Sequence, residues 1–559
     1  MRWLCSLERT RAGLGFAYGP YAAAAGNLTD VLGSADAVAH GSPEPEHAAR
    51  DKLAVSVAGG RPETTTPVAL GTLAAGIGAT TEAPEVAVRG VTLDSRDVRP
   101  GDLYAAVPGA NVHRARFAQE AAAAGAVAIL TDAAGAGMAA AAGLPVLLVD
   151  DPRARLGGIA ATVYGRPAER LLTIGVTGTN GKTTTAYLLE AGLRAGGHET
   201  GLIGTIETRI GDAAVPSERT TPEATDLQAL LAVMVEHGVG AVAMEVSSHA
   251  LSLGRADGLV LDVALFTNLG SDHLDFHGDL EAYFQAKSAL FTPGHARVGV
   301  VNLDDPYGRR LASSATVPVI TYSCSGDSAA DWRAEDLRLT AGGSTFVAVG
   351  PDATRVGASV QLPGRFNAEN ALGALVTIAT AGLPADAAAT GIASCAGVPG
   401  RMERVDAGQN FLALVDYAHT PEALATLLAA LRPLTTGRLI VVVGCGGDRD
   451  QGKRAAMGSI AARDADVVVV TDDNPRSEDP AAIRRAVLAG VGLVRPNVRA
   501  TVVEQGDRAA AIAAAVGLTQ PGDVLVVAGK GHETTQHVGS KILPFDDREV
   551  LRTALGSLR

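Results

Sequence analysis

The stretch LLTIGVTGTNGKTTT, from Leu171 to Thr185, decides the fold of this chain. An apolar, β-branched run ends in a glycine-rich turn, and a lysine and three threonines follow it. This order is typical of a strand that feeds a phosphate-binding loop and opens a helix, because glycines let backbone N–H groups turn toward phosphate oxygens. Lys182 is placed to reach the terminal phosphates, and the Thr183 hydroxyl is placed to ligate Mg²⁺. Val176 stands where the general pattern has its first glycine, so the loop is the narrower variant TGTNGKTT.

The composition excludes several classes of protein. The chain has 559 residues, of which 47% are hydrophobic, and a chain of this length is expected to hold roughly two to four domains. Its net charge is −13, and an acidic chain without a long Lys/Arg cluster is not expected to bind nucleic acid. No apolar run is long enough for a transmembrane helix, so we expect no membrane insertion. The cysteines have no spacing typical of zinc or redox sites, which fits a reducing, cytoplasmic compartment; they are Cys5, Cys324, Cys395 and Cys445.

The first part of the chain divides into an extension and a small α/β domain. Residues 1–66 are rich in Ala, Gly, Pro, Ser and Glu without a clear period, and we expect them to be disordered. Residues 67–165 contain the strand-like runs VRGVTLDSRDV, DLYAAVPG and AVAILTD, with a helix expected at Phe117–Ala124. This alternation predicts a small α/β unit.

Two larger α/β domains are predicted at 166–399 and 400–559. The first has strands near LLTIGVT, AVAMEVS, DVALFTN and VGVVN, and helices such as Thr183–Ala195 and Leu280–Leu290. The second has FLALVDY, RLIVVVG, DVVVVTD and DVLVVAG, which is a Rossmann-like pattern. Apolar strands that alternate with helices predict mostly parallel sheets covered on both faces.

Polar residues follow the predicted central strands at their carboxyl ends, where such sheets bind ligands. Glu245 ends AVAMEV, and Asp272 and His273 follow ALFTN in NLGSDHLDFH. Together with Thr183 they predict a Mg²⁺ site beside the phosphate-binding loop. A lysine on an amphipathic helix is usually a solvated charge. The apolar neighbours of Lys287, on the next predicted helix, leave open the alternative of a partly buried ammonium with a lowered pKa.

Four motifs stand in order along the chain: GTNGKTT, EVSSHAL, NLGSDHLDFH with the downstream AK, and GRFNAENALGA. Together they resemble the Mur ligases, the cytoplasmic ATP-dependent amide-forming enzymes of peptidoglycan precursor synthesis. The resemblance extends from about Val88 to Arg548. It implies a UDP-substrate-binding domain at 67–165, an ATP-binding domain at 166–399 and an amino-acid-binding domain at 400–559. We also expect a monomer.

The resemblance implies a role for each matching residue of the ATP site. Lys182, Glu245, His273 and Lys287 are expected to be catalytic, and Lys287 matches a lysine that this family carbamylates, which converts a cation into a carboxylate-like ligand. Mg²⁺ is expected on Thr183, Glu245, His273 and Lys287. The ATP-binding residues are expected to be Gly178, Thr179, Asn180, Gly181, Lys182, Thr183, Thr184, Asn302, Asn367, Asn370, Arg401, Asp416 and His419.

The resemblance also implies a site for UDP-N-acetylmuramoyl-L-alanyl-D-glutamate. Its residues are expected to be Leu93, Ser95, Thr220, Thr221, Ser247 and Arg255. At Ala110–Asn111–Val112 the chain departs from the polar residues that the family often has, and Leu253 replaces a frequent glutamine. At those positions we therefore expect the backbone, rather than the side chains, to contact the substrate.

The C-terminal motifs VDYAHTPEAL, GCGGDRDQGKR, DDNPRSEDP and AGKGHE resemble one branch of the family, the tripeptide synthetases. Asp-Asn-Pro-Arg alone is an ordinary turn sequence, but here it matches the tetrapeptide of the members that add meso-diaminopimelate. The planar donor fork of Arg476 suits the second carboxylate of that amino acid, which L-lysine lacks. Glu533 is expected to pair with its distal ammonium. The full set is Arg449, Asp473, Asn474, Pro475, Arg476, Gly529 and Glu533.

The expected reaction transfers the γ-phosphoryl group of ATP to the D-glutamate side chain, and the amine of diaminopimelate then displaces phosphate. Three alternatives stay open. A lysine-adding synthetase would differ at Arg476. A folylpolyglutamate-synthetase-like ligase shares the central fold, but the N-terminal LDSR and the Asp-Asn-Pro-Arg motif argue against it. The third is an ATP-binding protein without ligase activity.

Overall fold

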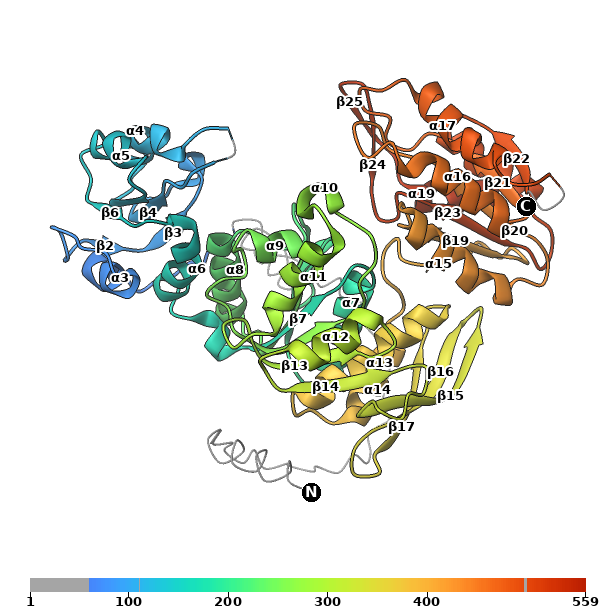
Figure 1. Cartoon of the computed structure of the whole chain (residues 1–559), viewed down its shortest axis with the longest axis horizontal. Helices are drawn as coiled ribbons and strands as arrows, with labels where there is room; N and C mark the ends of the chain where they lie inside the picture. Colours follow the sequence, from blue (N-terminus) through green and yellow to red (C-terminus); the bar gives the residue numbers. More distant parts are fainter. Residues whose placement is uncertain (1–59, 110, 497–499, 559) are drawn as a thin grey trace, which may run out of the picture. The chain divides into compact units, whose positions relative to one another are not determined.

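Three sheets with flanking helices make up the described part of the chain (Figure 1). The structure is a computed structural model, and it describes residues 60–109, 111–496 and 500–558. The sheets have four, eleven and six strands, and two short two-stranded sheets accompany them. The predicted α/β architecture is confirmed.

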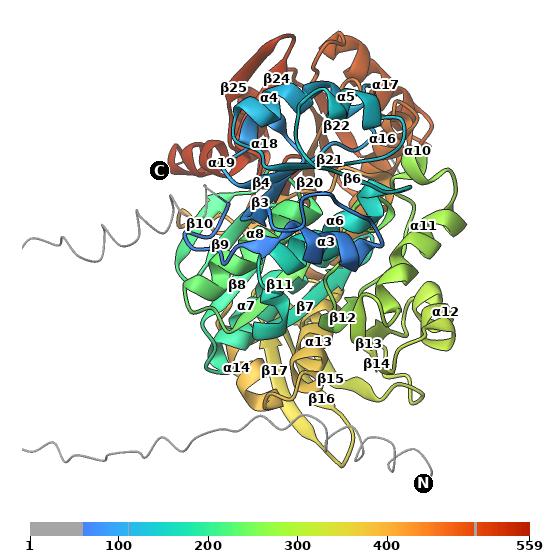
Figure 2. The same cartoon turned by 90° about the vertical axis from the view of Figure 1, so that its left-hand side faces the viewer.

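The N-terminal sheet, of which Figure 2 labels β3, β4 and β6, is parallel and has the strand order β3-β4-β5-β6. Its strands are β3 (Gly90–Thr92), β4 (Asp102–Ala105), β5 (Ala128–Thr131) and β6 (Val146–Leu148), and its helices include α3 (Leu70–Ile77), α4 (Ala118–Ala123), α5 (Ala136–Ala140) and α6 (Pro152–Val163). The helix expected at Phe117–Ala124 is therefore α4, preceded by a 3₁₀ turn. Helix α6 begins with a proline, and the Asp151 carboxylate caps it by accepting the Ala154 N–H.

The expected extension falls mostly outside the described residues, because the description begins at residue 60. Residues 60–66, which the sequence also assigned to it, contact the rest of the chain. The Arg61 guanidinium lies 2.6 Å from the Asp102 carboxylate. The backbone N–H groups of Glu63 and Thr64 donate to the Glu236 carboxylate, at 2.9 and 3.0 Å.

The central sheet has the order β10-β9-β8-β11-β7-β12-β13-β14-β15-β16-β17. From β8 to β15 neighbouring strands run parallel, whereas β9, β10, β16 and β17 form antiparallel edges. The strands are β7 (Leu172–Thr177), β8 (Thr200–Ile203), β9 (Glu207–Ile210), β10 (Ala213–Pro216), β11 (Ala241–Glu245), β12 (Leu261–Phe266), β13 (Ala296–Asn302), β14 (Val319–Ser323), β15 (Trp332–Thr340), β16 (Gly343–Val349) and β17 (Arg355–Val360). The mostly parallel sheet is as predicted, and the antiparallel edges are an addition to it.

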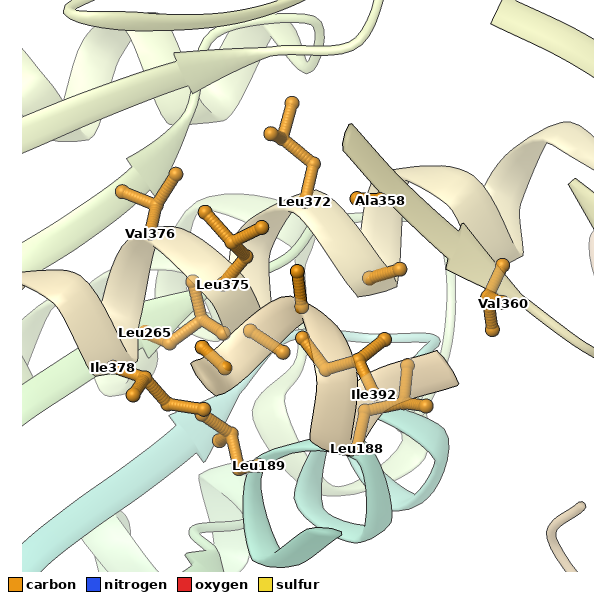
Figure 3. Packing of buried hydrophobic residues seen from close by; sticks show 14 of the residues in the cluster. Leu188, Leu189, Leu265, Ala358, Val360, Leu372, Leu375, Val376, Ile378 and Ile392 are labelled. Atoms are coloured by element: carbon orange, nitrogen blue, oxygen red, sulfur yellow. The ribbon is translucent and has the colours of Figure 1, made fainter. Parts of the chain in front are cut away.

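Helices cover the central sheet on both faces, as the apolar strands predict. Alternate residues of one strand enter different cores: Ala241 and Ala243 pack in one cluster, and Val242 and Met244 pack in the other. Figure 3 shows the first cluster, in which Leu265 of β12 meets side chains from three helices. These are α7 (Lys182–Ala195), α13 (Arg365–Thr380) and α14 (Ala385–Ser394). The second cluster includes side chains of α8 (Ala224–Glu236), α11 (Leu280–Ser288) and α12 (Pro306–Ser314).

The position of β7 fixes where the central sheet binds ligands. Strand β7 lies between β11 and β12, and the chain continues from β7 through α7 to β8, on the β11 side. It later crosses to β12 on the other side. Such a change of direction leaves a crevice at the carboxyl end of the strands. The glycine-rich loop at residues 178–181 leaves β7 at this end.

The C-terminal sheet has the order β18-β19-β23-β20-β21-β22, in which only β18 is antiparallel. Its strands are β18 (Glu403–Arg404), β19 (Leu412–Asp416), β20 (Leu439–Val443), β21 (Val467–Val470), β22 (Thr501–Glu504) and β23 (Val524–Ala528), and its helices are α15 (Pro421–Leu431), α16 (Lys453–Asp464), α17 (Pro480–Gly492), α18 (Arg508–Leu518) and α19 (Asp547–Gly556). A hairpin of β24 (Thr535–Val538) and β25 (Lys541–Pro544) follows β23. This agrees with the Rossmann-like pattern.

The composition led to two further expectations, one about membrane insertion and one about the cysteines. Among the described residues, none of the helices combines the length and the apolar character that crossing a bilayer requires. Cys324, Cys395 and Cys445 are free thiols, and Cys5 lies outside the described residues.

Candidate active site

The phosphate-binding loop is built against two neighbouring segments. Gly178 has φ +149°, and a Cβ there would lie 1.9 Å from Thr267 Oγ1. Gly181 has φ +87°, and its Cβ would lie 2.4 Å from Asn370 Oδ1. The loop also bonds to the segment after β12: Thr179 N donates to the Asn268 carbonyl (2.8 Å), and Asn180 N donates to Asn268 Oδ1 (3.0 Å). Both glycines are therefore required by close approach as well as by conformation.

We predict that Gly178→Ala destabilises the fold by about 1–3 kcal/mol and abolishes nucleotide binding. The added methyl would collide with Thr267 Oγ1, which cannot swing away without losing its 2.7 Å bond to the Asn180 carbonyl. Urea unfolding and nucleotide titration would measure both effects. Gly158→Ala in α6 is the matched control, because its Cβ meets nothing within 4 Å. Equal stability and nucleotide affinity in the two variants would contradict this account.

Three threonines bond to Glu245, which is 1% exposed at the end of β11: two reach its carboxylate and one reaches its backbone carbonyl. Thr183 Oγ1 donates to Glu245 Oε2 at 3.1 Å. Thr205 donates through its backbone N–H to Oε1 (2.7 Å) and through its hydroxyl to Oε2 (3.0 Å). Thr221 Oγ1 donates to the Glu245 carbonyl (2.9 Å) and accepts the Ser247 N–H (3.1 Å). The carboxylate is thus fixed beside the first helical residues of the loop.

Two lysine ammonium groups point at the carbonyls of the same loop. Lys182 Nζ donates to the carbonyls of Gly178 and Thr179, both at 2.9 Å. Lys287 Nζ donates to the Gly178 carbonyl at 2.7 Å and lies 4.5 Å from the centre of the Tyr283 ring. Lys287 is 1% exposed, and burial together with the nearby Lys182 lowers its pKa well below the usual value. The structure thus shows the buried amine that the sequence left open as an alternative to a solvated lysine.

His273 occupies a different environment from these buried groups. Its side chain is 48% exposed, and Nε2 lies 3.6 Å from the Asp272 carboxylate. Its backbone has φ +54°, a left-handed conformation that is uncommon for residues other than glycine. Met402 and Arg476 share this conformation. Such residues often mark functional sites.

One cavity of about 560 Å³ brings most of the expected ATP and catalytic residues together. It is lined by loop residues 179–184, by Glu245, His273 and Lys287, and by residues from α13 and the C-terminal domain. Of the expected residues it includes Thr179, Asn180, Gly181, Lys182, Thr183, Thr184, Thr220, Glu245, Ser247, His273, Lys287, Asn302, Asn367, Asn370, Arg401, Asp416 and His419. Gly178 is not in its lining, although its carbonyl binds both lysines.

Residues from the C-terminal domain approach the loop from the other side of this cavity. Arg401 Nη2 donates to Thr183 Oγ1 at 3.3 Å, and the Arg401 guanidinium stacks on the Tyr417 ring at 4.4 Å. Asp416, partly buried at the end of β19, accepts the N–H groups of Met402 and Ala418, both at 2.8 Å, and its desolvation raises its pKa. Arg401 therefore contacts the Thr183 hydroxyl, which the sequence predicts to be a Mg²⁺ ligand.

The residues expected to bind the UDP-linked substrate fall into two groups. Leu93 and Ser95 are buried just after β3 in the N-terminal domain. Thr220, Thr221 and Ser247 surround Glu245, and Leu253 follows α9 (Ser248–Ser252). Of the segment that departs from the family pattern, Asn111 and Val112 are exposed, and residue 110 lies outside the described residues.

Arg255 belongs to a charged cluster around Glu223, the residue that precedes α8. Arg255 Nε lies 3.1 Å from the Glu223 carboxylate, Arg153 Nη1 lies 3.4 Å from it, and Arg219 Nη1 lies 3.6 Å from it. Burial lowers the pKa of Arg255, and the neighbouring arginines lower it further. Three guanidinium groups around one carboxylate leave an excess of positive charge, which suits an anionic substrate.

The expected amino-acid site is a separate cluster at the carboxyl ends of β20, β21 and β23. Asn474 Nδ2 donates to Glu533 Oε2 at 2.9 Å. Gly529 approaches Asp473 so closely that a Cβ would lie 2.9 Å from its Oδ2. Arg476 Nη1 donates to the Gly447 carbonyl at 2.7 Å. Buried Pro475 and the exposed Arg449 lie on the same two loops. The cavity around the phosphate-binding loop does not include this cluster.

Sequence reasoning missed several residues that hold these groups in place. Thr205 binds both oxygens of Glu245, and Tyr283 accepts from Thr179 Oγ1 (3.2 Å) while its ring covers Lys287. Lys530 binds Asn474 and Glu533. Lys530 lies in the quoted motif AGKGHE, which is a signal that could have identified it. Thr205 and Tyr283 have no such motif, and only the structure relates them to the site.

Comparisons with known proteins agree with this geometry. Three family models match in order: "Mur ligase family, catalytic domain" over residues 87–164, "Mur ligase middle domain" over 176–378, and "Mur ligase, glutamate ligase domain" over 400–531. The UDP-N-acetylmuramoyl-L-alanyl-D-glutamate–2,6-diaminopimelate ligase of Streptomyces avermitilis is 57% identical over 495 residues, which cover 89% of this chain and 98% of that protein. The protein of the same name from Streptomyces coelicolor is 59% identical over 468 residues, which cover 84% and 92%.

A solved structure supports the same relationship. It is described as a UDP-N-acetylmuramoyl-L-alanyl-D-glutamate–2,6-diaminopimelate ligase and is 32% identical to this chain, with a TM-score of 0.66. The match covers 88% of this chain and 99% of that structure. The chain belongs to the Mur ligase family.

Proposed function

We propose that this chain is the ATP-dependent ligase that joins meso-diaminopimelate to the D-glutamate of UDP-N-acetylmuramoyl-L-alanyl-D-glutamate, a cytoplasmic step of peptidoglycan precursor synthesis. The observation that carries the proposal is the combination of two sites. One is a phosphate-binding loop with Lys182, Lys287 and Glu245 around it. The other is a cluster in which Arg476 and Glu533 supply opposite charges, as an amino acid with a distal zwitterion requires.

The residues of the first site fit ATP and Mg²⁺. The loop backbone and Lys182 suit the phosphates, and Thr183 Oγ1 and Glu245 Oε2, 3.1 Å apart, are the oxygen donors that Mg²⁺ prefers. Within the described residues no three His, Cys, Asp or Glu side chains gather as a metal site. We propose that Thr183, Glu245, His273 and a carbamylated Lys287, which line one cavity, hold Mg²⁺, which when bound neutralises charge on phosphoryl oxygens.

The proposed reaction has two steps. The side-chain carboxylate of D-glutamate attacks the γ-phosphorus of ATP, ADP leaves, and an acyl phosphate forms. The amine of diaminopimelate then attacks the acyl carbon, and phosphate leaves with the electron pair of the broken C–O bond. The attacking nitrogen loses a proton, and an amide remains. Lys182 and the loop N–H groups stabilise the charge that develops on the phosphoryl oxygens, while Arg476 and Glu533 orient the incoming amino acid.

Phosphate release by the purified chain tests this proposal. The assay contains ATP, Mg²⁺ and the UDP-linked dipeptide, with meso-diaminopimelate, L-lysine or no amino acid. Release that depends on diaminopimelate is the expected result. Release with L-lysine instead would indicate the lysine-adding alternative, and ATP binding without release under all three conditions would favour a protein without ligase activity.

We predict that Lys287 is carbamylated and that Lys287→Ala loses nearly all activity. Because burial lowers its pKa, more of the amine is neutral at neutral pH than in an exposed lysine, and only the neutral amine adds CO₂. The neutral fraction falls as the pH falls, so activity should fall with it and recover when bicarbonate is added. With ¹³C-bicarbonate, a carbamate signal in the NMR spectrum is expected in the wild type and not in Lys287→Ala. Full activity in CO₂-free buffer would refute this prediction.

A further inference from the structure

Lys530 is a fully buried lysine in the cluster proposed to bind the amino acid. It follows β23 and is 0% exposed. Its ammonium donates to Asn474 Oδ1 at 3.0 Å and to Glu533 Oε2 at 3.1 Å. Burying an ammonium is costly unless it is paired and hydrogen-bonded. The charge at this position therefore depends on these two partners, both of which belong to the proposed site.

The bonds of Lys530 determine how Asn474 and Glu533 point. Asn474 Oδ1 also accepts the His537 N–H (3.0 Å), and Asn474 Nδ2 donates to Glu533 Oε2 (2.9 Å). With two donors on its oxygen, the amide of Asn474 has one orientation. Glu533 Oε2 accepts both Lys530 and Asn474, and among the described residues no group donates to Oε1. The Glu533 side chain is 33% exposed, so Oε1 is the oxygen left for a ligand.

The same network extends to the backbone of Arg476. The hairpin residue His537, whose N–H binds Asn474, accepts the Arg476 N–H through its carbonyl at 2.9 Å. Gly539 N donates to the Arg476 carbonyl at 2.7 Å. Arg476 is held in this way in a left-handed conformation, with φ +51°. A change at Lys530 therefore reaches both the carboxylate and the guanidinium of the site.

We propose that Lys530 is a positioning residue for amino-acid binding. It holds Oε2 of Glu533 through its own bond and through Asn474, and so directs Oε1 toward the distal ammonium of the amino acid. Through Asn474 and the hairpin it keeps Arg476 in place for the distal carboxylate. This inference rests on the proposed function, because it concerns how that function selects its amino acid.

The test compares Lys530→Met and Lys530→Gln with Lys541→Met, an exposed lysine of β25. We expect Lys530→Met to raise the KM for diaminopimelate about tenfold or more and to leave the KM for ATP within about twofold. Lys530→Gln keeps one donor and should recover part of the loss. Lys541→Met should match the wild type. An unchanged KM for diaminopimelate would overturn the proposal, and so would an equal loss for every substrate.

A double variant separates positioning from simple loss of packing. If Lys530 acts through Glu533 as well as through Arg476, Lys530→Met added to Glu533→Gln should raise the KM for diaminopimelate by less than the two single effects multiplied together. Independent, additive effects would overturn the proposal, as would failure of both Lys530 variants to fold. The wild-type assay keeps the two hypotheses apart. A wild type without diaminopimelate-dependent phosphate release refutes the proposed function, whereas an active wild type with a normal Lys530→Met refutes only the role of Lys530.

Discussion

Lys182→Met should reduce kcat/KM for ATP-dependent phosphate release on the order of 10²–10³-fold, because one preorganised charge at a phosphoryl-transfer site contributes about this much. Its ammonium is anchored on the Gly178 and Thr179 carbonyls of the glycine-rich loop. Methionine keeps the apolar stem and removes only the charge. Steady-state kinetics with saturating amino acid would measure the loss.

The matched control for this prediction is Lys541→Met, which removes a lysine on the surface of the C-terminal hairpin. It should retain wild-type kinetics. We expect the Lys182 variant to fold, because the side chain of Lys182, the first residue of α7, bonds to the loop just before it. Thermal unfolding of both variants would check this. A Lys182→Met protein with wild-type kinetics would refute the assignment of this loop to the ATP phosphates.

Arg476→Ala should lower kcat/KM for meso-diaminopimelate about 100-fold, since a charge-assisted bond to a carboxylate contributes about 1.5–3 kcal/mol. Activity with L-lysine, which has no distal carboxylate, should change far less. The ratio of the two specificity constants should therefore fall by about the same factor. Arg476→Lys should lie between the two, because it keeps the charge and loses the planar fork.

Arg485→Ala is the control for Arg476→Ala. Arg485 lies on the exposed side of α17 and pairs there with Asp479. Competition between the two amino acids in one reaction, followed by mass analysis of the products, would give the ratio directly. If Arg476→Ala keeps its preference for diaminopimelate, Arg476 does not bind the distal carboxylate. The exposed Arg449, which the sequence also assigns to this site, would then be the next residue to test.

The parts of this fold that the sequence predicts well are those with local causes. The strand and loop around Gly178 are encoded by an apolar run and by glycines that adopt positive φ angles, +149° at Gly178 and +87° at Gly181. The antiparallel edges were harder to predict, because β15 alternates buried and exposed residues and carries a bulge between Glu335 and Arg338. Such a pattern has neither the continuous apolar run of a central strand nor a helical period.

The same distinction applies to the candidate site. Lys287, which stands in a quoted motif, could be singled out from the sequence, although its residue type and helix position alone favoured a solvated lysine over a buried one. Thr205 could not, because its bonds to Glu245 depend on a turn after β8 that passes a strand 40 residues later in the chain. Tyr283 was not singled out, because only the fold brings its ring against Lys287 and Thr179. The supporting contacts of a site depend on tertiary neighbours, and a single sequence does not contain them.

The proposed amino-acid cluster lies on loops of the C-terminal domain that follow β20, β21 and β23, whereas Lys182, Lys287 and Glu245 lie on α7, α11 and β11 of the central domain. Under the proposed function, different stretches of chain therefore encode most of amino-acid recognition and most of the phosphoryl chemistry, although Arg401 of the C-terminal domain contacts Thr183. Substitutions at a few positions around Asn474 and Lys530 could therefore change which amino acid such a ligase adds. The machinery for activating a carboxylate would be inherited unchanged.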